Sequence, residues 1–283
     1  MQKIAFLFLI IDNPNFPKIW DSYFRGNKDK YNIYIHSKYP DKLTWKKKNL
    51  INNLVDTEWG FITRAYIELL EEAYKDKDNI KFITISESCI PIQSFDNFYE
   101  DAINDKRSWI KSMSLRKYNY EARINPQKTK PKPQHFIKNY ARFCLNRIHV
   151  KLLLEKKKEL EFFHNMQVGD EYFLSVLYPL KNYKDFAVIY DDWEYIEKEK
   201  KKIKNEKRIL YEIQEKKGID KSKELEELEE KFKMIAKSPK TIMNVEEDLD
   251  KIKLCSSYFY RKFAKESNIE KYWKNIIKYH EKK

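Results

Sequence analysis

The first half of the chain alternates apolar runs with segments of helical periodicity. The apolar or alternating runs that predict β-strands lie at residues 3–11, 31–37, 80–86 and 107–114. The segments whose apolar positions recur at helical spacing lie between them, at residues 16–26, 61–74 and 95–105. Strand–helix–strand order with apolar strands is typical of a mainly parallel sheet covered on both faces. We therefore predict an α/β fold with such a sheet at its centre.

The pattern of the second half is less regular. Residues 116–135 are basic and rich in proline, without periodicity, which indicates a loop. Helices are predicted at residues 147–160, 171–180 and 269–279, with Asp170 as the N-cap of the second. Residues 185–193 and the aromatic run at 253–264 are predicted to be strands.

Residues 195–237 differ from the rest because charged residues dominate them. Leu225, Leu228 and Phe232 recur at helical intervals, and Gly218 supplies a turn. We predict an antiparallel helical hairpin, inserted into a single domain that spans residues 1–283. One interpretation is a helical excursion without a partner, and the other is an arm for homodimer formation or partner docking.

The composition supports a folded protein. The chain has 283 residues, of which 42% are hydrophobic and 15% aromatic, enough for a sizeable core. Only 4 residues are glycine, which argues against a glycine-rich nucleotide loop. The net charge of +13 favours anionic ligands such as phosphates, nucleic acid or acidic glycans, although an excess of lysine on solvated helices explains it equally.

The cysteines and the longest apolar run bear on location. The three cysteines, Cys89, Cys144 and Cys255, lie far apart and suggest neither a disulfide framework nor a zinc site. The longest apolar run, residues 4–11, is too short for a bilayer, which needs about 20 residues. We expect a soluble, cytoplasmic protein without a signal peptide, membrane anchor or transmembrane segment.

Ligands of a mainly parallel sheet bind at the carboxyl ends of its strands, where His36 and the run Ser86-Glu87-Ser88 are expected. A metal-dependent nucleotide-sugar enzyme would carry an Asp-x-Asp pair there. The chain has Asp76-Lys77-Asp78 before a strand and Asp248-Leu249-Asp250 in a predicted helix, and both are interpreted as solvated surface. We therefore predict no metal site and no cofactor.

Basic residues can offset the charge of a diphosphate leaving group without a metal. Arg261 and Lys262 follow an aromatic run that would hold them firmly, although ordinary surface cations remain the alternative. Glu171 is predicted in the first turn of a helix, whose dipole keeps a carboxylate ionised. Such a carboxylate can act as a general base, the alternative being a first-turn acid without a catalytic role.

Several stretches together resemble the core-2/I-branching β-1,6-N-acetylglucosaminyltransferase-like family, and most closely its plant-type branch. In chain order, the stretches that carry the resemblance are "KIAFLFLI", "YNIYIHSKYP", "EWGFITRAYIELLEEAY", "FITISESCIPIQSF", "GDEYFLSVL", "YDDW" and "YFYRKFA". They are spread over residues 1–192 and 238–265. Each is weak alone, but seven in the right order are fairly specific.

The resemblance implies a GT-A-like fold and an inverting, metal-independent transfer of a sugar from a UDP-sugar to a hydroxyl of a glycan or glycoprotein. The sugar would be a hexose, N-acetylglucosamine or xylose. Glu171 falls on the family's catalytic base, and Lys262, with Arg261 beside it, on the phosphate contact. His36 and Glu87 line the implied nucleotide end of the sheet. Asp170 and Trp193 are assigned to the acceptor side.

The chain also departs from the family. Golgi members carry a membrane anchor and several disulfides, for which this sequence shows no signal. The segments at 116–135 and 195–237 have no counterpart, so the acceptor cannot be inferred; the first is predicted to close over both substrates. Two other functions stay open: a basic nucleic-acid-binding protein, and a catalytically degenerate scaffold that docks a partner through the hairpin.

Overall fold

The computed structural model describes residues 1–113, 136–235 and 238–282. Its central sheet has six strands in the order β2-β1-β3-β6-β5-β7. These strands are β1 (Lys3–Ile10), β2 (Tyr31–Ser37), β3 (Asn79–Ser86), β5 (Ser108–Met113), β6 (Lys138–Asn146) and β7 (Tyr183–Lys184). β1 is parallel to β2 and β3, and β5 to β7, whereas β6 is antiparallel to both of its neighbours. The chain thus has the mixed α/β fold with a mostly parallel sheet that its strand–helix order predicts.

Strand β1 shows why the first apolar run is continuous. Phe6 and Phe8 pack into one hydrophobic cluster, and Ala5 and Leu7 pack into another. Because successive side chains of a strand point to opposite faces, a strand buried on both faces needs apolar residues at every position.

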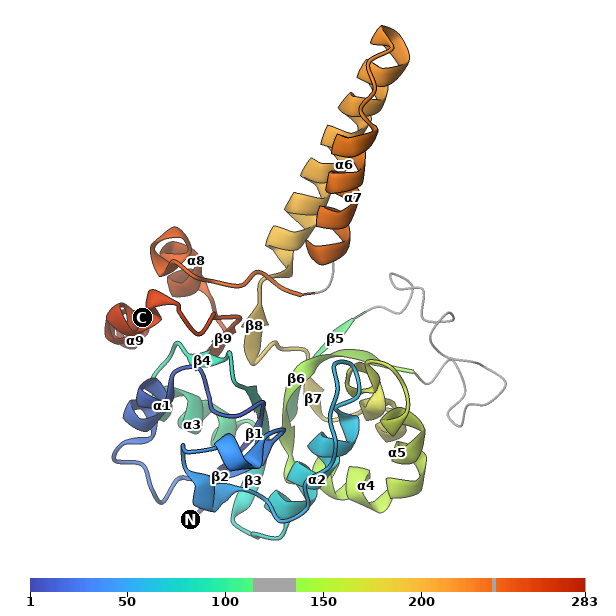
Figure 1. The fold of residues 1–283 in the computed structure, drawn as a ribbon. Helices are drawn as coiled ribbons and strands as arrows, with labels where there is room; N and C mark the ends of the chain where they lie inside the picture. Colours follow the sequence, from blue (N-terminus) through green and yellow to red (C-terminus); the bar gives the residue numbers. More distant parts are fainter. Residues whose placement is uncertain (114–135, 236–237, 283) are drawn as a thin grey trace.

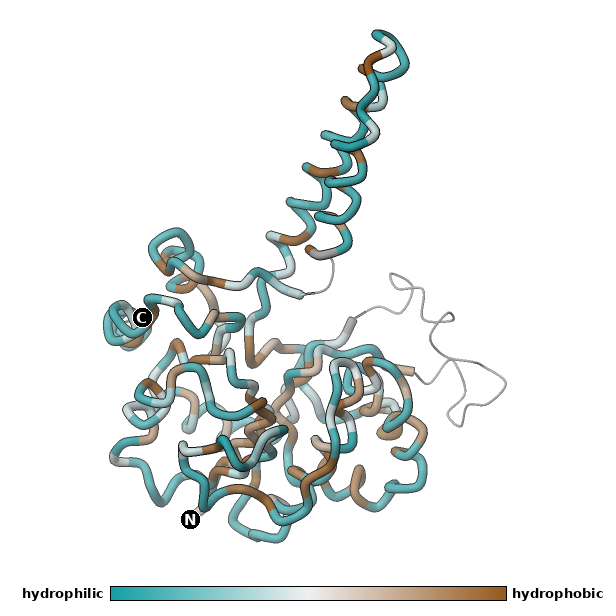
Figure 2. The backbone as a smooth tube through the Cα atoms, in the orientation of Figure 1, coloured by the Kyte–Doolittle hydropathy of each residue, from teal (hydrophilic) through white to brown (hydrophobic). Residues whose placement is uncertain are grey.

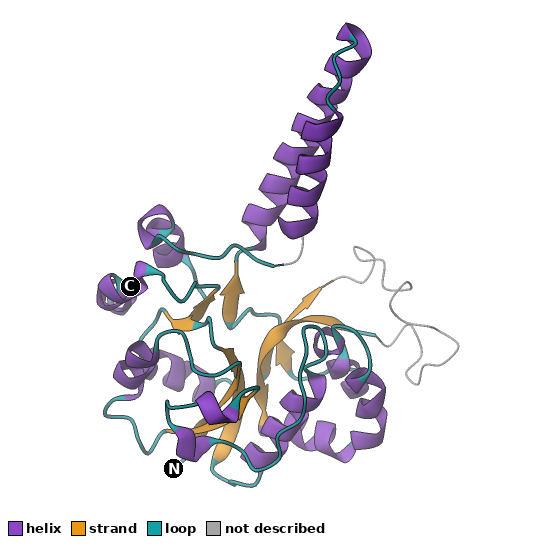
Figure 3. Cartoon of the chain, viewed as in Figure 1, coloured by secondary structure: helices purple, strands orange, loops and turns teal. Residues whose placement is uncertain are grey.

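Helices cover both faces of the sheet (Figures 1 and 3). One cluster contains residues of α1 (Pro17–Phe24), α3 (Phe95–Asn104), α8 (Leu249–Leu254) and α9 (Trp273–Glu281). The other contains residues of α2 (Thr63–Tyr74), α4 (Arg147–Glu155), α5 (Lys157–His164) and the short 3-10 helix η8 (Phe173–Leu177). The remaining 3-10 helices are η1 (Pro40–Lys42), η2 (Lys47–Asn49), η7 (Gly169–Glu171), η9 (Val245–Glu247) and η10 (Asn268–Lys271).

A second, smaller sheet joins distant parts of the chain. Its order is β4-β9-β8, with bounds of Ile90–Pro91, Phe259–Arg261 and Ile189–Asp191. β9 is antiparallel to β4 and parallel to β8. Since β4 follows closely after β3, this sheet brings the late part of the chain to the carboxyl end of β3.

Residues 195–237, where we predict a hairpin, contain most of α6 (Trp193–Lys217) and all of α7 (Ser222–Ile235). The two helices lie side by side and project from the body of the molecule (Figure 1). α6 ends at Gly218, whose φ of +61° suits glycine, and Asp220 accepts hydrogen bonds from the N–H and hydroxyl of Ser222. Figure 2 shows that most of their length is hydrophilic, with scattered hydrophobic positions.

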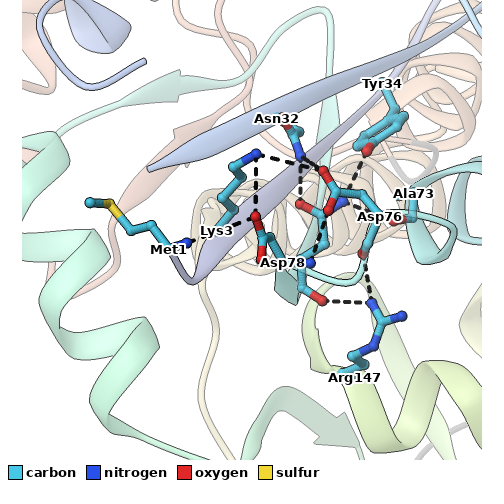
Figure 4. Close-up of polar contacts among 9 residues, drawn as sticks. Met1, Lys3, Asn32, Tyr34, Ala73, Asp76, Asp78 and Arg147 are labelled. Carbon is cyan, nitrogen blue, oxygen red and sulfur yellow. Dashed lines mark hydrogen bonds and ion pairs between the residues drawn. The ribbon is translucent and has the colours of Figure 1, made fainter. Parts of the chain in front are cut away.

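The two Asp-x-Asp pairs lie away from the carboxyl ends of the central strands. Asp76 and Asp78 precede β3, where both form ion pairs with Lys3 at the start of β1 (Figure 4). Asp76 also accepts a hydrogen bond of 2.7 Å from Asn32. The other pair is not solvated surface throughout, because Asp248 is buried and Lys240 Nζ lies 2.7 and 2.9 Å from its two oxygens.

Two of the predicted helices are wrong, and one strand was missed. β6 was not foreseen, and the helix predicted at 147–160 is two helices, α4 and α5, which meet at Lys156. The helix predicted at 171–180 is replaced by the short turns η7 and η8. The loop predicted at 116–135 lies outside the described residues. Within the described ranges, none of the helices has the length and apolarity needed to cross a bilayer.

Candidate functional site

The end of β3 is where the two sheets meet. After Ser86 the chain turns through Glu87 and Ser88, and the Ser86 hydroxyl lies 3.2 Å from Cys89 Sγ. The carbonyl of Ser88 accepts a hydrogen bond of 3.1 Å from the N–H of Phe263, just beyond β9. The polar cluster at this strand end is therefore covered by the segment that carries the two predicted phosphate contacts.

Arg261, the last residue of β9, is held by a carboxylate. Its Nη1 lies 2.8 Å from Asp191 Oδ1, with both side chains largely buried. Its Nε is buried and has no hydrogen-bond partner among the described residues. An unpartnered guanidinium donor is costly to bury, so this atom calls for an explanation such as an anionic ligand.

Lys262 lies beside Arg261 and close to Glu87. Burial lowers the pKa of Lys262, as does the charge of Arg261, whereas Glu87 and Asp191 raise it. The Nζ of Lys262 donates to the hydroxyl of Ser238 at 3.3 Å. The structure thus brings Lys262, Arg261 and Glu87 together, three of the residues that the sequence predicts at the donor side.

Arg142 is a second buried guanidinium that sequence reasoning missed. It lies on β6, and its Nη1 donates to the hydroxyl of Tyr66 on α2 at 2.6 Å. Its Nε has no hydrogen-bond partner in the part of the chain that the structure describes. Burial lowers the pKa of Arg142. The acidic groups around it, chiefly Tyr66 and to a smaller extent Asp191 and Asp170, raise the pKa by more than burial lowers it, so the side chain stays charged.

Asp170 is buried near these two guanidiniums, and its predicted role as a helix cap is wrong. Val168, with a φ of +54°, occupies the N-cap position of η7, and no side chain caps it. Burial raises the pKa of Asp170 to about 7, and the charge of Glu171 raises it as well, while Arg142 and Arg261 oppose the shift. Its Oδ1 has no hydrogen-bond partner among the described residues.

Glu171 lies next to Asp170 but keeps access to solvent. Its side chain is 30% exposed, and its Oε2 lies 3.1 Å from Lys138 Nζ at the start of β6. The predicted helix dipole is absent because η7 ends at this residue. The ammonium of Lys138, rather than a helix terminus, supplies the favourable charge beside this carboxylate.

A close packing of backbone segments fixes this loop. A Cβ on Gly169 would lie 2.1 Å from the carbonyl oxygen of Phe163 and 2.9 Å from Thr63 Oγ1, so a larger residue does not fit. Val168 donates its N–H to the carbonyl of Gly60 at 2.6 Å, and its own carbonyl accepts from the N–H of Glu171 at 3.0 Å. The loop before α2 and the loop that carries Glu171 are therefore joined directly.

The two other predicted residues lie further from this cluster. His36 lies on β2, which β1 separates from β3. Its buried ring accepts the N–H of Val55 at 3.0 Å, and burial lowers its pKa to about 4, so it is neutral at physiological pH. Trp193 is half-buried and begins α6, two residues after the Asp191 that pairs with Arg261.

The side chains of this region can be compared with the ligands of a metal site. No group of three or more His, Cys, Asp and Glu side chains within residues 1–113, 136–235 and 238–282 is placed to hold a metal ion. The structure instead places two guanidiniums, Arg142 and Arg261, near the buried carboxyl of Asp170. Lys262 lies beside Arg261, and the more exposed carboxylate of Glu171 is next to Asp170 in the chain. Such a set can bind an anionic group and accept a proton next to it.

The raised pKa of Asp170 makes the stability of the protein depend on pH. The ordinary pKa of this carboxyl is 3.8, and its value in the folded protein is about 7, so the folded state binds more protons between these values. The contribution of Asp170 to stability is therefore full below its ordinary pKa and is lost as pH rises through the folded value. Asp170→Asn removes this dependence, so the Tm of the variant relative to the original protein should increase from about pH 4 to about pH 7 and then level off.

Thermal unfolding of both proteins from about pH 5 to about pH 8 measures this difference. His36 titrates with the opposite sign, since its pKa is lowered on folding, but it is present in both proteins and cancels. A difference in Tm that is constant with pH would show that the carboxyl of Asp170 does not titrate in this range.

Comparison with known proteins adds two findings. The profile of the family described as "Core-2/I-Branching enzyme" matches residues 4–209. A rice protein (Oryza sativa subsp. japonica) named glycosyltransferase BC10 is 28% identical over 172 residues, which make up 57% of this chain and 42% of that protein. The chain therefore matches less than half the length of this relative.

Proposed function

This chain belongs to the core-2/I-branching enzyme family of glycosyltransferases, and from that premise we propose that it transfers a sugar from a UDP-sugar to a hydroxyl acceptor with inversion and without a metal. The observation that carries the proposal is the pair of largely buried guanidiniums, Arg142 and Arg261, each with an unused donor and both close enough to Asp170 to lower its pKa. The 30% exposed carboxylate of Glu171 is next in the chain. A nucleoside diphosphate is an anion of the kind that such a pair binds.

In the proposed reaction, Glu171 removes the proton of the acceptor hydroxyl. The acceptor oxygen then forms a bond to the anomeric carbon, while the bond between that carbon and the diphosphate oxygen breaks. The electron pair of the broken bond leaves with UDP, and attack from the opposite face inverts the configuration. Arg261 and Lys262 stabilise the negative charge on the departing diphosphate, and Arg142 supports them. In metal-dependent glycosyltransferases a bound divalent cation has this role.

The adjacent carboxyls of Asp170 and Glu171 have different surroundings, which suits different roles for the two residues. Asp170 is buried with a pKa of about 7, so it is protonated for part of the time at neutral pH. Glu171 is more exposed, so an acceptor hydroxyl can approach it, and its Oε2 lies 3.1 Å from Lys138 Nζ. We assign proton removal to Glu171 and a supporting acceptor-side role to Asp170 and Trp193. Glu87 and His36 are assigned to the donor side.

The arrangement of the sheets supports a GT-A-like fold. The proposed donor site lies at the carboxyl end of β3, as expected for ligands of parallel sheets, and the small sheet closes over it. We propose a single domain over residues 1–283, with α6 and α7 as an insertion between β8 and β9. Homodimer formation through residues 195–237 stays a prediction from the sequence.

Binding of UDP in the presence of excess EDTA tests the proposal. Calorimetric titration should give saturable binding that EDTA leaves unchanged, because protein cations supply the charge. Lys262→Ala should weaken this binding by roughly tenfold or more, since a hydrogen bond to a charged group contributes about 1.5–3 kcal/mol.

Lys77→Ala is the matched control, because Lys77 is exposed and precedes β3, at the end of this strand opposite to the proposed donor site. Its binding should equal that of the original protein. Binding that appears only when Mn²⁺ is added would overturn the metal-free mechanism. An absence of UDP binding under both conditions would overturn the donor assignment.

A further inference from the structure

A short turn before α2 presents two aromatic side chains to solvent. Residues Glu58 and Phe61 pair across it, and the N–H of Phe61 donates to the carbonyl of Glu58 at 2.9 Å. Trp59, at the tip, is 70% exposed, and Phe61 is 38% exposed. By contrast, Trp20, Trp45, Trp109 and Trp273 are all buried. Because the large ring of Trp59 is exposed to solvent, it indicates a binding surface rather than part of the core.

This turn is attached to the loop of the proposed general base. The carbonyl of Gly60 accepts the N–H of Val168, whose carbonyl accepts the N–H of Glu171. Gly60 has a φ of +83°, which favours glycine, and a Cβ there would lie 3.2 Å from Gln167 Cγ. Trp59 is therefore held in a tight turn, and two successive backbone hydrogen bonds, through Val168, connect this turn to Glu171.

The charged residues that lie next to Trp59 in the sequence indicate what it binds. Asp56 and Glu58 are exposed on the same segment as Trp59. Carboxylates accept hydrogen bonds from hydroxyl groups, and the C–H face of a pyranose packs on an aromatic ring. An anionic membrane surface or a nucleic acid would instead be repelled by these carboxylates. The combination of ring and carboxylates thus matches a neutral, hydroxyl-rich sugar.

We propose that Trp59 is the stacking platform for a neutral pyranose of the acceptor, whose hydroxyl it presents to Glu171. The inference rests on the proposed function, because it assigns Trp59 to the acceptor side of that site. It names the acceptor class as a neutral glycan, with Asp56 and Glu58 as acceptors for its hydroxyls. Phe61 lies at the base of the same turn and widens the apolar surface.

Saturation-transfer NMR tests the platform directly. The probes are methyl β-D-glucopyranoside, methyl β-D-galactopyranoside, lactose and cellobiose, each with the full chain and with UDP present. We expect saturation of the pyranose C–H protons for at least one of these probes. Trp59→Ala should weaken its binding by roughly tenfold, and Trp59→Phe should retain most of it because the ring face is kept.

Tyr211→Ala is the matched control, since Tyr211 is an exposed aromatic residue on α6, 52% accessible to solvent. Binding should be unchanged in this variant. Titration with UDP alone should give the same Kd for Trp59→Ala as for the original protein, which shows that the donor side and the fold are intact.

The outcomes separate this inference from the proposed function. Equal sugar saturation in Trp59→Ala and the original protein, or no saturation of any probe while UDP binds, overturns the platform and leaves the donor assignment standing. Binding of Trp59 to phosphatidylcholine or phosphatidylserine vesicles in place of the sugars also overturns it. Sugar binding that depends on Trp59 without any UDP binding supports the platform and overturns the proposed donor.

Discussion

Replacement of Glu171 by Gln is expected to lower kcat by about 10²–10⁴ while UDP binding is kept, because general-base catalysis contributes a factor of this size. The amide has nearly the shape of the carboxylate but cannot accept the proton of the acceptor hydroxyl. The backbone N–H of this residue and its hydrogen bond to Val168 are unchanged by the substitution. The amide oxygen can still accept a hydrogen bond from Lys138, so the loss should appear mainly in turnover.

Turnover is measured with the UDP-sugar and acceptor that the binding screens identify, and UDP affinity by calorimetry. Glu161→Gln is a suitable control, because Glu161 is an exposed carboxylate on the nearby helix α5. It should behave as the original protein does. Full turnover in Glu171→Gln, with intact UDP binding, would remove Glu171 as the base.

The second large effect is expected at Arg261, where stability and catalysis can be separated. Arg261→Gln should lower kcat/KM by about 10²–10³, the usual loss when one donor to a developing negative charge is removed. It should also destabilise the fold by roughly 3 kcal/mol, because Asp191 is left buried without its partner.

The double variant Arg261→Gln with Asp191→Asn distinguishes the two effects. Removing the uncompensated carboxylate should restore most of the stability lost in Arg261→Gln, as measured by denaturant unfolding. Activity should stay low, since the cation that we propose to contact the diphosphate is still missing. Recovery of activity together with stability would show that Arg261 acts only through the fold.

The part of the site at the strand ends could be predicted from the sequence. The period and length of the apolar runs identify β2 and β3. Polar residues that follow these strands, such as Glu87, can then be assigned to the carboxyl end of the sheet, where ligands bind. That Lys262 reaches Glu87 does not follow from these runs. It depends on the pairing of β9 with β4, which joins residues far apart in the chain.

Arg142 was missed because its strand lacks a recognisable pattern. β6 contains Lys138, Asn139 and Asn146, all of them buried together with Arg142, so neither strict alternation nor a continuous apolar run appears. The signal that could have found the site is an arginine followed at once by the apolar run Phe143–Leu145. A cation in a strand with buried neighbours needs a buried partner or an anionic ligand.

The helix predicted at 171–180 fails for another reason. Residues 172–177 are all buried, so the segment has no solvated face for an amphipathic helix to present. Pro179 closes the segment soon afterwards, because the residue before a proline disfavours helical geometry. The chain forms two short turns between α5 and β7 instead, and these turns carry the buried Asp170 close to Arg142.

The central position of β9 in the small sheet affects how recombinant fragments should be cut. A boundary drawn at residue 209, where the family match stops, would fall within α6 and discard Arg261 and Lys262. It would also strip β4 and β8 of the strand that pairs with both, leaving two bare edges open to self-association. Such a fragment would keep the proposed base but not the proposed leaving-group contacts, so its inactivity would say nothing about the activity of the full chain.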